Sequence, residues 1–328
     1  MLEKIRIGIA GYGNLGRGVE MAIARNPDMQ LTGVFSRRDP ADIRLLTAAV
    51  PVHKLDDIAQ FREQIDVLIL CGGSKNDLPV QGPALAALFN TVDSFDTHNK
   101  IPEYFSAVDN AARAGERTAI ISVGWDPGLF SLNRLFGEAI LPAGETYTFW
   151  GKGLSQGHSD AVRRVPGVKA GVQYTIPSTE AMERVRSGQQ PQLSTREKHT
   201  RECHVVLEAG ADAATVKQAI VSMPDYFADY DTTVHFISEE ELRDNHAAMP
   251  HGGFVIRSGQ TAEGSQQVME YSLKLGSNPE FTASVLVAYA RAAFRLYRSG
   301  TYGAHSVLDI APGLLSPKSA AQLRKELL

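Results

Sequence analysis

Six residues near the start of the chain match the G-x-G-x-x-G pattern of a phosphate-binding turn: Gly11, Tyr12, Gly13, Asn14, Leu15 and Gly16. In this pattern the first glycine permits a tight turn, the second lets a pyrophosphate approach the backbone, and the third allows close packing of helix on strand. The helix that follows offers free N–H groups and the positive end of its dipole. Because the pattern opens a strand–turn–helix–strand unit, we predict dinucleotide binding rather than an ordinary turn.

The residues at the exit of the second strand of this unit indicate which dinucleotide is bound. An NAD site usually carries an acidic residue there, which binds the ribose 2′-hydroxyl. This chain has Ser36, Arg37 and Arg38 instead. Two guanidinium groups and a hydroxyl suit a 2′-phosphate, since arginine pairs with phosphate oxygens in a fork. We therefore predict NADP, the alternative being a solvated basic pair at a strand end.

Short apolar runs alternate with helical segments through the first part of the chain. Expected strands lie at 5–10, 31–35, 67–71, 91–96 and 118–123, with helices near 83–89 and 101–115. This alternation predicts a parallel, doubly wound sheet of the Rossmann type, in which ligands bind beyond the C-terminal strand ends. Besides the turn and Ser36–Arg38, the expected cofactor-binding residues at those ends are Cys71, Gly72, Gly73, Ser74, Ser94, Phe95, Asp96, Val123, Gly124, Trp125, Asp126 and Pro127. For Cys71 we favour a buried strand residue over thiol chemistry.

The pattern changes after about residue 125. Segments 199–207 and 267–275 alternate apolar and polar residues, which predicts an open mixed or antiparallel sheet with one wet face. Helices near 179–187 and 211–222 are expected to cover the other face. We therefore predict a dinucleotide-binding domain at 1–124 and an α+β substrate-binding and dimerisation domain at 125–278. A helical segment from 279 onward is expected to return to the first domain.

Composition narrows the class of protein. The chain has 328 residues, 43% hydrophobic and 21% charged, with a net charge of −4. These values favour a globular protein with a sizeable core, and the absence of a basic run argues against a nucleic-acid partner. No apolar run reaches the roughly 20 residues of a membrane span, and no signal peptide is recognisable. The two cysteines, Cys71 and Cys203, fit a cytoplasmic location.

Three other readings compete with a dehydrogenase. Residues 153–157, GLSQG, fit the G-x-S-x-G elbow of a serine hydrolase, with Ser155 as nucleophile and His251 as a candidate base. That reading leaves the glycine turn and the arginine pair without a role. A methyltransferase would favour an acidic residue where Arg37 stands, and a regulator would lack a polar cleft. Histidines occur without metal-ligand spacing, so we expect no metal site.

Four segments resemble the meso-diaminopimelate dehydrogenase family: VGWDPG at 123–128, FWG at 149–151, GLSQGHSD at 153–160 and MPHGG at 249–253. The resemblance runs through essentially the whole chain. It implies NADP-dependent, reversible oxidative deamination of the D-centre of meso-2,6-diaminopimelate, giving L-2-amino-6-oxoheptanedioate and ammonia. It also implies a homodimer that serves lysine and cell-wall precursor metabolism. Another NADP-dependent amino acid dehydrogenase is the alternative.

A substrate with two carboxylates and two ammonium groups needs both cationic and anionic partners. The resemblance implies that the distal L-centre is held by four residues: Thr175, Arg201, His251 and Asn278. Alternatively, Thr175 is an ordinary strand residue, Arg201 a solvated charge and Asn278 a helix cap.

The reacting D-centre is expected near the nicotinamide, beside Asp96 and Asp126. Two carboxylates there can hold an ammonium and stabilise an iminium, although Asp126 could also cap a helix beginning at Pro127. Whether either aspartate or a bound water accepts the proton stays open. Trp125 and Trp150 would exclude water. The remaining substrate residues expected are Gln156, Gly157 and Asp160, on a loop.

Overall fold

Buried β-branched and leucine residues form the central strands of a seven-stranded sheet in the computed structural model, which describes residues 4–47 and 49–328. Strand β4 (Val67–Leu70) is buried on both faces. Val67 and Ile69 pack into one apolar cluster, whereas Leu68 and Leu70 pack into another. A continuous apolar run is therefore needed here, because both faces of a parallel sheet are covered by helices.

The strands of this sheet are all parallel and run in the order β14-β6-β5-β4-β1-β2-β3. Besides β4, they are β1 (Ile5–Ala10), β2 (Met29–Ser36), β3 (Val52–Lys54), β5 (Thr91–Asp93), β6 (Thr118–Ile120) and β14 (Gly303–His305). Their C-terminal ends lie along one edge of the sheet, which is where the sequence predicted that the cofactor binds. The expected doubly wound sheet is confirmed.

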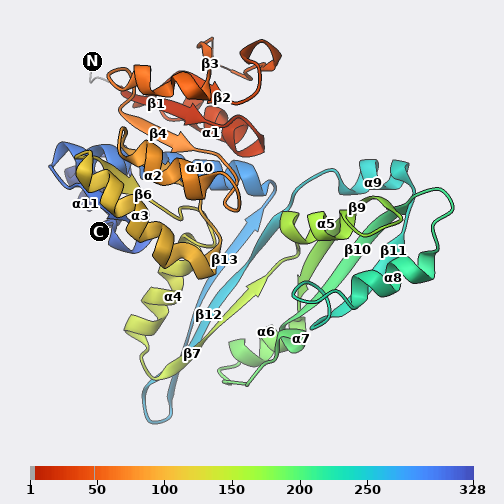
Figure 1. The fold of residues 1–328 in the computed structure, drawn as a ribbon. Helices are drawn as coiled ribbons and strands as arrows, with labels where there is room; N and C mark the ends of the chain where they lie inside the picture. Colours follow the sequence, from red (N-terminus) through yellow and green to blue (C-terminus); the bar gives the residue numbers. More distant parts are fainter. Residues whose placement is uncertain (1–3, 48) are drawn as a thin grey trace. The chain divides into compact units, whose positions relative to one another are not determined.

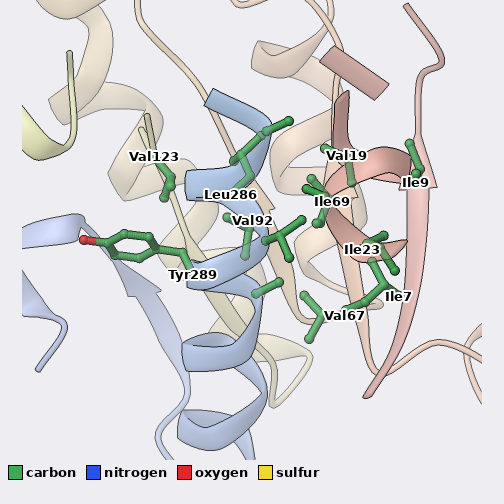
Figure 2. Packing of buried hydrophobic residues seen from close by; sticks show 14 of the residues in the cluster. Ile7, Ile9, Val19, Ile23, Val67, Ile69, Val92, Val123, Leu286 and Tyr289 are labelled. Carbon is green, nitrogen blue, oxygen red and sulfur yellow. The ribbon is translucent and has the colours of Figure 1, made fainter. Parts of the chain in front are cut away.

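Helices cover the two faces of the parallel sheet. Leu286 and Tyr289 of α10 (Asn278–Arg298) pack with Val19 and Ile23 of α1 (Asn14–Ala24) against β1 and β4 (Figure 2). The opposite face carries α2 (Leu78–Ala86) and α3 (Ile101–Ala114). Helix α2 begins five residues before the expected segment and contains Pro83 in its interior. The remaining helices are α11 (Ala320–Leu327) and the 3₁₀ turns Pro40–Asp42, Leu55–Phe61, His98–Lys100, Val307–Asp309 and Pro312–Leu314.

Contacts divide the chain into two compact units, Met1–Leu132 with Pro279–Leu328, and Asn133–Asn278. Figure 1 shows the strands and helices of each unit. The second unit has a four-stranded mixed sheet, order β11-β10-β9-β8, and a three-stranded antiparallel sheet, order β13-β12-β7. Its strands are β7 (Gly144–Trp150), β8 (Gly153–Leu154), β9 (Val168–Pro177), β10 (His199–Leu207), β11 (Asp231–Phe236), β12 (His251–Ala262) and β13 (Ser265–Leu275).

Two apolar clusters support the sheets of the second unit. One joins α5 (Gln156–Arg163) and α8 (Ala213–Val221) to the mixed sheet through residues such as Val162, Cys203 and Ile220. The other joins α6 (Thr179–Arg186) to the antiparallel sheet through Phe149, Val185 and their neighbours. The other helices are α4 (Leu129–Ile140), which spans the boundary of the units, α7 (Thr195–Lys198) and α9 (Glu239–His246).

Candidate functional site

The turn between β1 and α1 contains three glycines with different constraints. Gly11 has a φ of 97°, and a Cβ on Gly16 would lie 2.3 Å from the carbonyl oxygen of Gly11. Both positions therefore require glycine for the turn itself. A Cβ on Gly13 would meet nothing within 4 Å. The turn thus leaves open space beside Gly13, at the N-terminus of α1, where a phosphate group can approach.

The arginine pair lines the same cavity as this turn. Arg38 donates through its guanidinium to the carbonyl of Tyr12, and its backbone N–H donates to the Ser36 hydroxyl over 3.1 Å. Arg37 forms an ion pair of 2.9 Å with Asp77. The cavity is lined by Gly11, Tyr12, Gly13, Ser36, Arg37, Arg38, Leu55, Cys71, Gly72, Asp77 and Gln81. Leu55, Asp77 and Gln81 were not predicted, because no local pattern marks a residue that reaches a cavity from a neighbouring helix.

Tyr12 is held by a buried carboxylate. Its hydroxyl donates to Glu20, which also accepts the backbone N–H of Leu46 over 3.0 Å. Burial and the contact with Glu20 raise the pKa of Tyr12 to about 12, so its hydroxyl stays protonated. Tyr12 is therefore fixed at both its side chain and its carbonyl, and the carbonyl in turn fixes Arg38.

Hydrogen bonds join the exits of β4 and β5. The Ser74 hydroxyl accepts the backbone N–H of Asp96 over 3.0 Å and donates to the carbonyl of Ser94 over 3.4 Å. Asp96 itself is an exposed residue. The structure thus brings three of the predicted residues together at neighbouring strand ends. Cys71 follows β4 directly, and burial raises the pKa of its thiol, which agrees with a packing role.

Buried Asp93, which the sequence did not mark, organises the adjacent exits of β5 and β6. Its carboxylate accepts the backbone N–H groups of Phe95, over 2.9 Å, and of Ser122, over 3.1 Å. It also accepts the Tyr104 hydroxyl over 2.7 Å. Burial raises the pKa of Asp93 to about 6, against the effect of these three donors. Asp93 therefore fixes the backbone that carries Phe95 and leads to Val123.

Asp126, in the segment after β6, does not cap a helix that begins at Pro127, as the sequence had allowed. Helix α4 begins at Leu129, so Asp126 is not its N-cap and Pro127 is not its first residue. Trp125 and Gly128 instead form an isolated bridge, across a cis Asp126–Pro127 peptide bond. A Cβ on Gly128 would lie 1.8 Å from the carbonyl oxygen of Gly124, so the chain doubles back tightly here. The buried Trp125 ring packs edge-on against Phe130, with centroids 5.2 Å apart.

In the second unit, Arg201 and Thr175 face each other across β10 and β9. They are register partners, and the guanidinium of Arg201 donates to the Thr175 hydroxyl. Gln173 Nε2 also approaches this hydroxyl, at 3.3 Å. With both lone pairs of its oxygen used, Thr175 retains its own proton for a further acceptor. Arg201 is buried, with 6% exposure, so the alternative of a solvated charge is wrong.

Trp150 is held in place by His199, a residue that the sequence did not single out. The backbone N–H of Trp150 donates to Nε2 of His199 over 2.8 Å, and the two rings stack with centroids 5.4 Å apart. His199 is buried, and burial with the nearby charge of Arg201 lowers its pKa to about 3. The imidazole is therefore neutral, as its role as an acceptor requires.

His251 lies near Thr175, because Gly153 is close to both residues. Gly153 is the register partner of Thr175, and a Cβ on Gly153 would lie 2.5 Å from the His251 ring. The backbone N–H of Asn278 donates to the carbonyl of Met249 over 3.0 Å, beside the start of β12. Of the residues expected around the distal carboxylate, Thr175, Arg201 and His251 are therefore gathered around β8.

The predicted substrate loop is a helix. Gln156, Gly157 and Asp160 lie in α5, which Ser155 caps by accepting the backbone N–H of His158. Asp160 pairs with Arg163 on the exposed side of this helix. A Cβ on Gly157 would meet nothing within 4 Å. The side chain of Gln156 lies outside the described part of the chain.

The serine of the G-x-S-x-G segment contacts a different histidine from the one expected. Ser155 Oγ lies 2.7 Å from Nδ1 of His158, whose ring packs edge-on against Tyr226. Burial and the charge of Arg201 lower the pKa of His158 to about 4. Ser155 thus has a structural role as a helix cap, and a hydrolase is not favoured.

Three histidines of the second unit lie close together. The ring of His204 stacks on His235, with centroids 4.9 Å apart, and lies 4.1 Å from the centroid of His246. Even so, no group of three or more His, Cys, Asp or Glu side chains in residues 4–47 and 49–328 could hold a metal ion. Among the helices in these same ranges, none is long and apolar enough to cross a bilayer.

Comparison with known proteins gives concordant results. Residues 124–277 match the family model described as the diaminopimelic acid dehydrogenase C-terminal domain. The chain is 65% identical to a meso-diaminopimelate D-dehydrogenase of Ureibacillus thermosphaericus, over 100% of both chains. It is 46% identical to the enzyme of that name from Corynebacterium glutamicum, with 98% of each chain covered.

Solved structures with similar sequences have the same fold. A Corynebacterium glutamicum DAP dehydrogenase in complex with DAP is 46% identical, covers 100% of both chains and gives a TM-score of 0.92. An engineered D-amino acid dehydrogenase bound to NADP⁺ is 44% identical, with a TM-score of 0.86 and coverage of 99% of this chain and 100% of the other.

Proposed function

The chain belongs to the meso-diaminopimelate D-dehydrogenase family, and we infer that it catalyses the NADP-dependent, reversible oxidative deamination of the D-centre of meso-2,6-diaminopimelate. With water, the products are L-2-amino-6-oxoheptanedioate, ammonium, NADPH and a proton. The observation that carries this inference is the 65% sequence identity, over the full length of both chains, with an enzyme of that name. The glycine turn and the arginine pair, which line one cavity, agree with it. The pathway served is that of lysine and cell-wall precursors.

The first unit supplies a site that fits NADP. Open backbone at Gly13 and the N-terminus of α1 suit a pyrophosphate, and the arginine pair with Ser36 suits a 2′-phosphate. NADP, when bound, accepts a hydride from the substrate carbon. We propose that the residues at the exits of β4, β5 and β6, which include Ser74, Ser94 and Val123, hold the remainder of the cofactor.

The residues of this chain bind and orient the substrate. We propose that Asp96 and Asp126 bind the ammonium of the D-centre and stabilise the iminium through their negative charge. The proton acceptor is one of these carboxylates or a bound water. Trp125 and Trp150 exclude water from the reacting carbon.

Substrate selection depends on the distal L-centre. Arg201 supplies a buried positive charge, and Thr175 retains a hydroxyl proton, so both suit one carboxylate. We propose that His251, Asn278, Gln156, Gly157 and Asp160 complete the substrate contacts.

We also propose a cytoplasmic homodimer. Leu135, Phe136 and Ile140 of α4 are 42%, 45% and 60% exposed, which supports contact with a second copy through this face. Light scattering should give a mass about twice the 35.6 kDa of one chain. A mass of one chain at micromolar concentration contradicts the dimer.

The function is tested by following NADP reduction with meso-, LL- and DD-diaminopimelate side by side. We expect rapid reduction with the meso isomer alone, because only this isomer offers a D-centre for reaction and an L-centre for binding. Comparable rates with the DD isomer would favour a less selective amino acid dehydrogenase. Absence of reduction with all three would contradict the proposed activity.

A further inference from the structure

The guanidinium of Arg201 is a buried cation with an uncommon set of partners. One side is held by the Thr175 hydroxyl, whereas its Nε is buried and has no hydrogen-bond partner in the described structure. Its carbon Cζ lies 3.9 Å from the centroid of the Tyr230 ring. Burial lowers the pKa of Arg201, and Tyr230 counteracts this effect through both its charge interaction and a side-chain hydrogen bond.

Tyr230 reaches this position from a firmly attached segment. It directly precedes β11, which pairs in parallel with β10 and places Thr232 opposite Arg201. Its backbone N–H donates to the carbonyl of Phe227 over 3.0 Å, and the Phe227 ring is fully buried in the cluster that contains Cys203. The Tyr230 ring is therefore anchored to the same core as the strand that carries Arg201.

We propose that Tyr230 is a positioning residue for substrate binding: its ring holds the Arg201 guanidinium in the plane that receives the distal carboxylate. An aromatic face attracts a cation without neutralising its charge. A carboxylate in the same place would neutralise Arg201 and would compete with the substrate. This inference rests on the proposed role of Arg201 in binding the L-centre.

The test compares Tyr230→Leu, which removes the ring, with Tyr230→Phe, which keeps it. For Tyr230→Leu we expect KM for meso-diaminopimelate to rise roughly tenfold, the effect of losing a desolvated cation–π contact, with kcat within about twofold. Tyr230→Phe should keep KM within about threefold of the wild-type value. Tyr230→Met, which fills the volume without a ring, replaces Tyr230→Leu if that variant does not fold.

A double-mutant cycle separates positioning from general packing. In an Arg201→Met background, Tyr230→Leu should produce no further rise in KM, because the group that it positions is gone. An equal rise in both backgrounds, or an unchanged KM in Tyr230→Leu, would overturn the proposal. If the wild type is active and Arg201→Met is impaired, but Tyr230→Leu is neutral, only this inference fails. An inactive wild type would instead contradict the proposed function.

Discussion

Arg37 and Arg38 are adjacent in sequence but differ in their surroundings. Arg37 is 68% exposed and pairs with Asp77, whereas Arg38 is fixed through the carbonyl of Tyr12. The exposed pair contributes little to stability, since solvent screens it. The guanidinium of Arg37 is therefore available to a 2′-phosphate at small cost to the fold, whereas that of Arg38 is already held at the cavity by Tyr12.

Removing this pair should change the preference for the cofactor. We expect Arg37→Ala with Arg38→Ala to raise KM for NADP tenfold or more, by loss of two charge-assisted contacts, and to change KM for NAD much less. Arg25→Ala, at the exposed end of α1, serves as the control. Steady-state kinetics with both cofactors measure the effect. An equal change in the two KM values would refute binding of the 2′-phosphate by this pair.

Some residues at the site could not be predicted from the sequence. His199 and Tyr230 act on Trp150 and Arg201, and these partners lie on other strands or loops of the fold. Periodicity reveals which face a residue occupies but not which residue lies opposite in a neighbouring strand. The glycine turn was predictable, because its chemistry is local and its spacing is fixed by one turn of backbone.

At the scale of elements, some strands and helices begin where the sequence predicted them, whereas β9 and β12 were not predicted. The strand His199–Leu207 has the predicted limits, because alternation of apolar and polar residues marks its whole length. Helix α5 was taken as a loop, since Gly157 in its first turn conceals a helix that is capped by Ser155. Asp126 and Pro127 resemble a cap and first helical residue, but they lie in a tight return before α4.

Two glycines of the β1–α1 turn should respond differently to alanine. Gly16→Ala places a Cβ 2.3 Å from a backbone oxygen, so we expect a fall in Tm of several degrees as well as weaker NADPH binding. Gly13→Ala meets no protein atom within 4 Å, and Tm should stay within about one degree. Its methyl group occupies the space of the pyrophosphate, so NADPH binding should fall at least tenfold. Calorimetry measures both quantities, and equal affinity in Gly13→Ala and wild type would contradict this site.

At the scale of the whole molecule, the two units differ in the partners of their buried arginines. Buried Arg291 in the first unit is paired with Asp28, and it lowers the pKa of that carboxylate. Arg201 in the second unit has a hydroxyl and an aromatic ring instead. An unpaired buried cation reduces stability unless a ligand supplies the missing charge. The sequence could not distinguish these two arginines, because their partners are set by tertiary contacts.

Buried His199 should make the second unit sensitive to acid. Burial lowers the pKa of His199 to about 3, against about 6.5 in the unfolded chain. The contribution of this neutral histidine is therefore complete above pH 6.5 and is lost as the pH falls toward 3, because the unfolded chain binds the proton first. At pH 4.5 this loss is roughly 3 kcal/mol. His199→Gln keeps an acceptor for the N–H of Trp150 and should flatten the decline of Tm between pH 7 and 4.5, whereas the exposed His98→Gln should not. Scanning calorimetry across this range measures the slope, and parallel slopes for His199→Gln and wild type would exclude His199 as its source.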